Sequence, residues 1–106
     1  MIGLQSSGEG YRLESLSRGV LGGRLLPYEL TIQPAGHVKV TCVPESGDIA
    51  AYCLSGQCTL SRNGETEPFE EGDSLHISVE DAEITLQSGG EWETRILLMM
   101  DPREMI

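Results

Sequence analysis

Thiols, imidazoles and carboxylates are the side chains of this sequence with the most chemistry to offer. Its 106 residues contain three cysteines, Cys42, Cys53 and Cys58, and two histidines, His37 and His76. Such groups can bind zinc, but these cysteines do not form the CxxC pairs typical of zinc or redox sites. Three thiols cannot all pair, so we expect reduced cysteines buried as small hydrophobic residues. A strained disulfide between Cys53 and Cys58, which flank a turn, is the alternative.

The charge balance excludes several classes of partner. Seventeen acidic residues face seven basic ones, which gives a formal net charge of -10. A field of this sign repels phosphate backbones and anionic membrane surfaces, so we expect no nucleic acid and no membrane partner. No apolar run approaches the roughly 18 residues that span a bilayer, and no signal peptide is evident, which predicts a cytoplasmic protein. Motifs for a nucleophilic serine, a phosphate-binding loop, a zinc protease or a dinucleotide are missing, so no cofactor is expected.

The elements that must position these groups are β-strands. Apolar and polar residues alternate along the chain, and no stretch of a dozen residues has an apolar stripe at helical spacing. The length suits one domain over residues 1–106. Asn63-Gly64 is the dipeptide that most readily forms a type I′ hairpin, so 58–62 should pair with 65–69. The expected strands are 11–16, 23–32, 38–42, 48–54, 57–62, 65–69, 74–79, 83–87 and 92–99.

Short strands separated by Gly, Asn and Pro turns favour a sandwich or a small barrel with a pocket at its wider end. The apolar run 96–99 is predicted to be buried on both faces or to lie at a subunit contact. The acidic run 65–73 is predicted to be a solvated hairpin edge that discourages aggregation, with calcium binding as the alternative.

Residues 34–98 resemble the core barrel of the cupins in their pattern of turns. The features that carry this resemblance are Pro34-Ala35-Gly36, Tyr52-Cys53-Leu54-Ser55-Gly56-Gln57, Asn63-Gly64 and Glu71-Gly72-Asp73-Ser74. They occur in cupin order at cupin-like spacing over about two thirds of the chain. The resemblance implies an all-β fold, a double-stranded β-helix (jelly-roll) barrel, with the segment 11–32 supplying N-terminal strands.

The metal ligands of the cupins do not occur at the matching positions. In the first motif, counted from Gly36, the two histidine positions fall on Cys42 and Pro44. The glutamate position falls on Ile49, or on Asp48 with a one-residue slip. In the second motif, counted from Gly72, the histidine position falls on Glu83. Because iron, manganese and nickel need several imidazoles and a carboxylate converging on one point, we expect no metal here.

Five residues are the candidates for a ligand pocket. The resemblance implies that Cys42, Asp48 and Glu83 lie toward the barrel interior, where a buried carboxylate needs a cation such as Arg95. Tyr52 is a candidate pocket wall or an interface anchor. In the alternative register, Ile84 and Leu86 point inward and Glu83 lies in solvent, and the alternation alone favours this arrangement.

The resemblance leaves three functions open. The first is a metal-free, homodimeric module that binds a small ligand, with 23–32 and 96–99 at the dimer contact. The second is an isomerase, dioxygenase or lyase that uses Cys42, Asp48 and Glu83. The third rests on a looser similarity, over 43–56 and 83–98, to small cupin-like nucleoside phosphorylases, in which Arg62 or Arg95 would bind phosphate.

Overall fold

Eight β-strands make up almost all of the chain that the structure describes. The structure is a computed structural model, and residues 4–16, 26–42, 49–77 and 84–100 are described. No helix occurs in these ranges, which confirms the expected all-β class. The strands are β1 (Leu4–Ser15), β2 (Leu26–Cys42), β3 (Ile49–Ser55), β4 (Gln57–Arg62), β5 (Glu65–Glu70), β6 (Ser74–Ile77), β7 (Ile84–Ser88) and β8 (Thr94–Met100).

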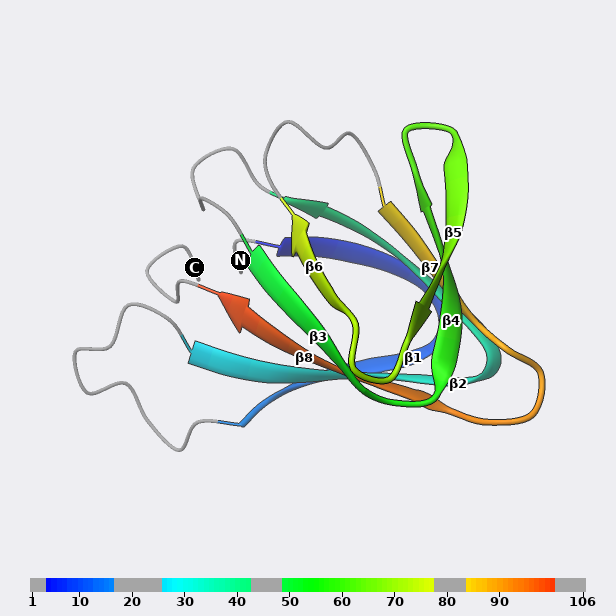
Figure 1. The fold of residues 1–106 in the computed structure, drawn as a ribbon. Coiled ribbons are helices and arrows are strands. Elements are labelled where there is room, and N and C mark those ends of the chain that lie inside the picture. Colours follow the sequence, from blue (N-terminus) through cyan, green and yellow to red (C-terminus); the bar gives the residue numbers. More distant parts are fainter. Residues whose placement is uncertain (1–3, 17–25, 43–48, 78–83, 101–106) are drawn as a thin grey trace.

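The long strand β2 connects the two halves of the barrel. Its first part, 26–32, pairs with β8, and its second part, 37–40, pairs with β7, while β1 runs antiparallel along its other side. The strand order is β5-β4-β7-β2-β8-β3-β6. One half therefore contains β8, β3 and β6, and the other contains β7, β4 and β5. This arrangement is the expected jelly-roll barrel (Figure 1).

A single strand replaces the two that the sequence predicts on either side of Pro34-Ala35-Gly36. The chain bends at this point without leaving the sheet, because Ala35 takes a φ of 62°. The register of β1 against β2 also shifts between Glu9 and Tyr11, opposite the bend. Gly36 packs there against Gly10, and a Cβ on Gly36 would lie 2.5 Å from the Gly10 carbonyl oxygen. The predicted turn is thus a bend within β2.

The core lies between the two halves and consists of the inward-facing residues of every second position. In β3, for example, Ile49, Ala51 and Cys53 are buried and alternate with exposed Ala50 and Tyr52. The buried hydrophobic residues are Tyr28, Leu30, Ile32, Val38, Val40, Ile49, Ala51, Cys53, Cys58, Leu60, Phe69, Leu75, Ile77, Ile84, Leu86, Ile96 and Leu98.

Most of the strand predictions are confirmed within a residue or two. Strands β4 and β5 form the hairpin expected from Asn63-Gly64, with positive φ angles of 52° and 79° at its turn. Ile84 and Leu86 point inward, which is the register that the alternation favours. The last strand begins at Thr94 rather than at Trp92, and β1 begins earlier than predicted, at Leu4. Residues 43–48 and 78–83, which contain several predicted strand ends, lie outside the described ranges.

Candidate functional site

A cleft separates β5 from β6, the two strands at the ends of the sheet order. Its volume is about 760 Å³. At one end the cleft is closed, because the corner 71–73 between the two strands hydrogen-bonds to the backbone around Gly56. Glu71 N donates to Gly56 O at 3.1 Å, Gly72 N donates to Cys53 O at 2.9 Å, and Cys53 N donates to Asp73 O at 2.9 Å. We call this space the β5–β6 cleft.

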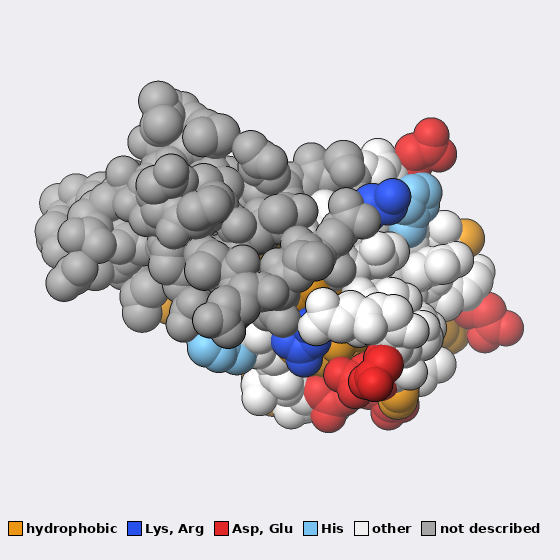
Figure 2. Space-filling view, turned by 90° about the horizontal axis from the view of Figure 1, so that it is seen from above, with side chains coloured by type: hydrophobic (Ala, Val, Ile, Leu, Met, Phe, Trp, Pro, Cys, Tyr) orange, Lys and Arg blue, Asp and Glu red, His pale blue; other side chains and the backbone are white. Residues whose placement is uncertain are grey.

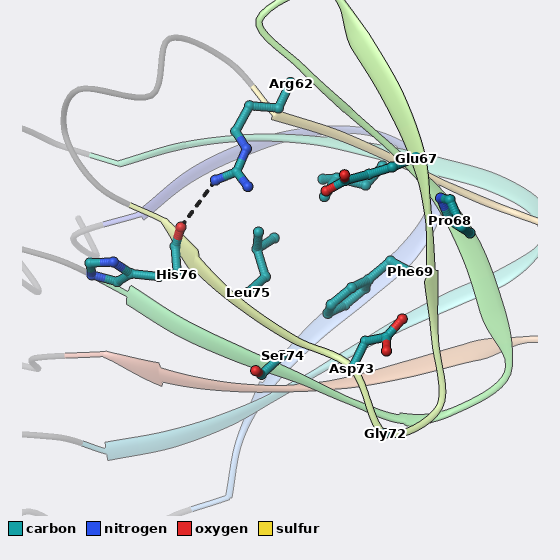
Figure 3. Close-up of a pocket in the computed structure, with 10 residues that line it drawn as sticks. Arg62, Glu67, Pro68, Phe69, Gly72, Asp73, Ser74, Leu75 and His76 are labelled. Carbon is teal, nitrogen blue, oxygen red and sulfur yellow. Dashed lines mark hydrogen bonds between the residues drawn. The ribbon is translucent and has the colours of Figure 1, made fainter.

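At the opposite end an arginine side chain crosses the β5–β6 cleft. Half-buried Arg62, the last residue of β4, donates from Nη1 to the carbonyl oxygen of His76 on β6 at 3.2 Å. Figure 3 shows the guanidinium reaching across the gap, with Leu75 and Phe69 deeper in the cleft. The base of the cleft is therefore apolar, whereas at its entrance the positively charged side chain of Arg62 links the two halves of the barrel.

The inward-facing positions of the β4–β5 hairpin change from apolar to charged toward the entrance. In β4, buried Cys58 and Leu60 alternate in register with Arg62. Their partners on β5 are Phe69, Glu67 and Glu65, in the same order. Only the pair at the closed end is apolar on both strands. The hairpin thus places Arg62, Glu65 and Glu67 on the side that faces the barrel interior.

Two carboxylates, those of Glu67 and Asp73, also line the β5–β6 cleft. Glu67 points from β5 into the gap, on the side where Arg62 lies (Figure 3). Asp73 accepts the backbone N–H of Glu70 through Oδ2 at 2.9 Å, which fixes its carboxylate at the closed end. Seen from the open end, acidic side chains gather on the part of this face that the described residues form (Figure 2). An apolar floor with donors and acceptors at the rim suits a small polar molecule with an apolar portion.

Metal binding has no support within the described ranges. No three His, Cys, Asp or Glu side chains there lie close enough to bind one ion.

The same part of the chain contains no helix able to span a bilayer.

Of the five residues predicted to form a pocket, only Tyr52 and Arg95 have described side chains. Asp48 and Glu83 lie outside the described ranges, and Cys42 is the last residue of β2, with a side chain that is also outside them. Tyr52 lies on the outer face of β3 and is 44% exposed. Arg95 lies on the outer face of β8.

Arg95, the predicted partner of Glu83, forms an ion pair with Glu29 on the outer face of the sheet. Arg95 Nε donates to Glu29 Oε1. This hydrogen bond and the positive charge of Arg95 lower the pKa of the Glu29 carboxyl, and the same hydrogen bond raises the pKa of Arg95. Arg95 can reach Glu29 because 29 and 95 point outward on neighbouring strands as diagonal neighbours, two residues apart in register.

Two of the cysteines behave as the sequence predicts. Cys53 and Cys58 are free thiols, and both are buried. Burial raises the pKa of Cys58 to about 12, and the nearby Cys53 adds to the shift. Burial also raises the pKa of Cys53, whose Sγ lies 3.5 Å from the carbonyl oxygen of Ser55. Both are therefore core residues rather than nucleophiles.

The charged residues of the β5–β6 cleft were missed as a site, although the sequence contains a signal for them. The hairpin prediction sets Arg62 opposite Glu65, and the alternation of Cys58, Leu60 and Arg62 puts all three on one face. Together these two observations place Arg62, Glu65 and Glu67 on the inward face. The interpretation of the acidic run 65–73 as a solvated hairpin edge does not take the inward orientation of Glu65 and Glu67 into account.

Comparison with solved structures shows the fold of the chain. A cupin-2 domain of an XRE family transcriptional regulator from Enterobacter cloacae has a TM-score of 0.70 and 13% identity, and the match covers 88% of this chain and 97% of that one. The polyketide cyclase RemF from Streptomyces resistomycificus has a TM-score of 0.72 and 18% identity, with 93% of this chain and 70% of that one covered. A cupin-2 domain protein from Rhodospirillum rubrum has a TM-score of 0.71 at 13% identity, over 94% and 69% of the two chains.

These likenesses confirm the cupin fold that the turns predict. At identities of 13% to 18% they show the fold alone. No family model matches the sequence, and no curated protein matches it. The named neighbours include a domain of a regulator and an enzyme, so the cupin fold is common to proteins of different activity.

Proposed function

We propose that this cupin-fold protein binds a small polar molecule in the β5–β6 cleft without a metal ion. The observation that carries the proposal is the change from apolar to charged side chains along the inward face of the β4–β5 hairpin. In a barrel that served only as a scaffold, inward positions would stay apolar, because a charge that faces a core must be paired or hydrated. Here Arg62 and Glu67 line a cavity of ligand size, and Glu65, the register partner of Arg62, lies on the same face of the hairpin.

Edge protection is the competing explanation for these charges. β5 ends the sheet order, and inward-pointing charges on such a strand discourage pairing with a second molecule. This explanation accounts for Glu65 and Glu67 but not for Arg62. β4 is paired on both sides, and its arginine reaches across the cleft to His76. A ligand site accounts for all three residues.

Thermal unfolding with a panel of amino acids, sugars and sugar phosphates, together with inorganic phosphate, tests the proposal. A ligand at one hundred times its Kd stabilises the folded state by about 2.7 kcal/mol, which shifts the Tm of a domain of this size by roughly 10 °C. We expect at least one compound to raise the Tm, and Arg62→Gln or Glu67→Gln to abolish the shift.

The matched control is Arg12→Gln. Arg12 is an exposed arginine of β1 paired with Glu14 at 2.5 Å, so the change removes the same charge away from the cleft. The ligand-induced shift should persist in this variant. The proposal is rejected if no compound raises the Tm, or if the shift survives in Arg62→Gln and Glu67→Gln.

Phosphorolysis of nucleosides is a second candidate, and the position of Arg62 favours it. Of the two arginines considered for phosphate binding, Arg62 lines the β5–β6 cleft, whereas Arg95 is bound to Glu29 on the outer face. Incubation with inosine or uridine and phosphate should release free base if this activity exists. Its absence leaves the binding proposal in place and removes the enzymatic one.

We further propose that the protein is a homodimer that associates through the outer face of β3 and β8. Tyr52 and Leu97 are register partners there, and Ala50 is the partner of Met99. Tyr52 is 44% exposed, and Leu97 and Met99 are half-buried. The ion pair of Arg95 with Glu29 borders this apolar area. A rim with both signs of charge is self-complementary under two-fold symmetry.

Size-exclusion chromatography with light scattering tests the dimer. The wild-type chain should have twice its 11.5 kDa mass at micromolar concentration. Tyr52→Glu should give a monomer, because it introduces a charge at the centre of the contact. Trp92→Glu changes an exposed aromatic residue outside this face and should leave the dimer intact. A monomeric wild-type protein overturns this proposal.

A further inference from the structure

A tryptophan stands exposed at the closed end of the barrel, away from the entrance of the β5–β6 cleft. Trp92, in the connection between β7 and β8, is 74% exposed. Such exposure is unusual for a large aromatic side chain, and most of its indole surface contacts water. Tryptophan is enriched at protein–protein interfaces, so this exposed indole is a candidate contact for a partner.

The backbone that carries Trp92 is held by buried hydroxyl groups. Ser88 Oγ donates to the carbonyl oxygen of Trp92 at 2.9 Å, and Thr94 Oγ1 donates to the carbonyl oxygen of Gln57 at 3.0 Å. The two hydroxyls also lie 3.0 Å apart, and both side chains are buried. The connection is thus tied to β4. The backbone at Trp92 is therefore ordered before binding, so a partner that covers the indole does not have to order this connection.

Trp92 lines two neighbouring hollows. One, of about 350 Å³, is lined by Gly56, Gln57, Glu70, Glu71 and Trp92. The other, of about 450 Å³, is lined by Gln57, Gly89, Gly90, Glu91 and Trp92. Gln57 and Trp92 belong to both linings, so the two hollows are neighbours, and together they form one groove. We call this groove, with its lining residues, the Trp92 surface.

The charge of the Trp92 surface is entirely negative. Glu70, Glu71 and Glu91 line the hollows, and no lysine or arginine does. The negative field also reaches the core. Burial raises the pKa of the Cys53 thiol, and the charges of Asp73, Glu71 and Glu70 raise it further.

We infer that the Trp92 surface docks a basic peptide segment of a partner protein, with lysine or arginine side chains on either side of the indole. Arginine and lysine stack on the face of tryptophan more favourably than on any other ring. Carboxylates in each hollow can then pair with further cations of an extended strand. Complementary charge selects this partner, because a nucleic acid or an acidic peptide would be repelled by a molecule of charge -10.

Fluorescence provides a direct test, because Trp92 is the only tryptophan of the chain. The probe is a synthetic (Arg-Gly)4 peptide, titrated in a buffer of low ionic strength, with (Glu-Gly)4 as the control peptide. We expect the arginine peptide to change the emission of Trp92 saturably and the glutamate peptide to have no effect. Raising the salt to about 0.5 M should weaken binding, because screening at that concentration is strong.

Variants separate a specific site from general attraction by the net charge. The double change of Glu70→Gln and Glu71→Gln should weaken the peptide about five-fold or more, since each partly exposed ion pair contributes modestly. Glu14→Gln, with Glu9→Gln added to match the charge, lies on β1 and should have no comparable effect. Trp92→Ala, followed by the anisotropy of a labelled peptide, should also lose affinity. The inference fails if no saturable change occurs, or if both double variants weaken binding equally.

Discussion

Gly56 allows the sharpest test of how the two halves of the barrel are joined. It is the only residue between β3 and β4, and its φ is +81°. An added Cβ would lie 2.4 Å from the carbonyl oxygen of Glu93 and 3.0 Å from the Cα of Thr94. Gly64, in the β4–β5 hairpin, has nearly the same φ, +79°, but nothing lies within 4 Å of its Cβ position. The two glycines therefore differ in crowding and hardly at all in backbone conformation.

The expected costs follow from this difference. Alanine in the left-handed region costs about 1 to 2 kcal/mol, and Gly64→Ala should lose about that much stability. Gly56→Ala has the same conformational cost. In addition, the backbone at Glu93 must move to admit the new methyl group, and forced overpacking typically costs about 1 to 3 kcal/mol. The total for Gly56→Ala is therefore about 3 kcal/mol, a large part of the stability of a small domain.

Urea unfolding monitored by far-ultraviolet circular dichroism measures both changes, since the described secondary structure is all strand. Fluorescence is less suitable, because Trp92 is exposed before unfolding begins. We expect Gly56→Ala to lose at least about 1 kcal/mol more than Gly64→Ala. Equal losses, within about 0.5 kcal/mol, would refute the argument that Gly56 is required by the close approach of Glu93.

Three further predictions concern the buried thiols, the hydroxyl pair and the outer ion pair. At pH 8 Cys58 should react with iodoacetamide at least about 100-fold more slowly in the folded protein than in urea, as peptide mapping would show, because its thiol stays protonated. Thr94→Val should cost about 1 to 3 kcal/mol in urea unfolding, because it removes the donor to Gln57 from a buried site, and Thr94→Ser should restore most of it. The folded-state pKa of Glu29 lies below its unfolded value, so its ion pair stabilises the fold above the unfolded pKa. That stabilisation should disappear as the pH falls through the folded pKa, and Glu29→Gln should flatten the acid limb of the stability curve.

Sequence reasoning succeeded where the determining interactions are local. The Asn63-Gly64 hairpin depends on two backbone conformations and on strands directly adjacent in the chain. The inward positions of Ile84 and Leu86 follow from simple alternation. The order of the turns sufficed to identify the fold, because the described corners at Gly56, Asn63-Gly64 and Gly72 all consist of residues with positive φ.

It failed where the outcome depends on neighbours distant in sequence. Pro34 and Gly36 are typical of a turn, yet β2 continues through them because β1 pairs on both sides of the bend. The partner of Arg95 is Glu29, 66 residues away, and no local pattern indicates that the two strands are adjacent. The inward orientation of Glu67 does not follow from its own segment, because 65–68 is polar on both faces, and only the pairing with β4 reveals it.

The place of β8 in the sheet has a consequence for the order of folding. The last described strand lies between β2 and β3, and both of its neighbours are synthesised before it. During synthesis, β2 and β3 therefore cannot pair with β8 until residues 94–100 have emerged from the ribosome. Pairings at this sequence separation form slowly, and the waiting chain exposes the edges of β2 and β3. Release of the final strand, rather than formation of the early hairpins, should therefore commit the chain to its native state.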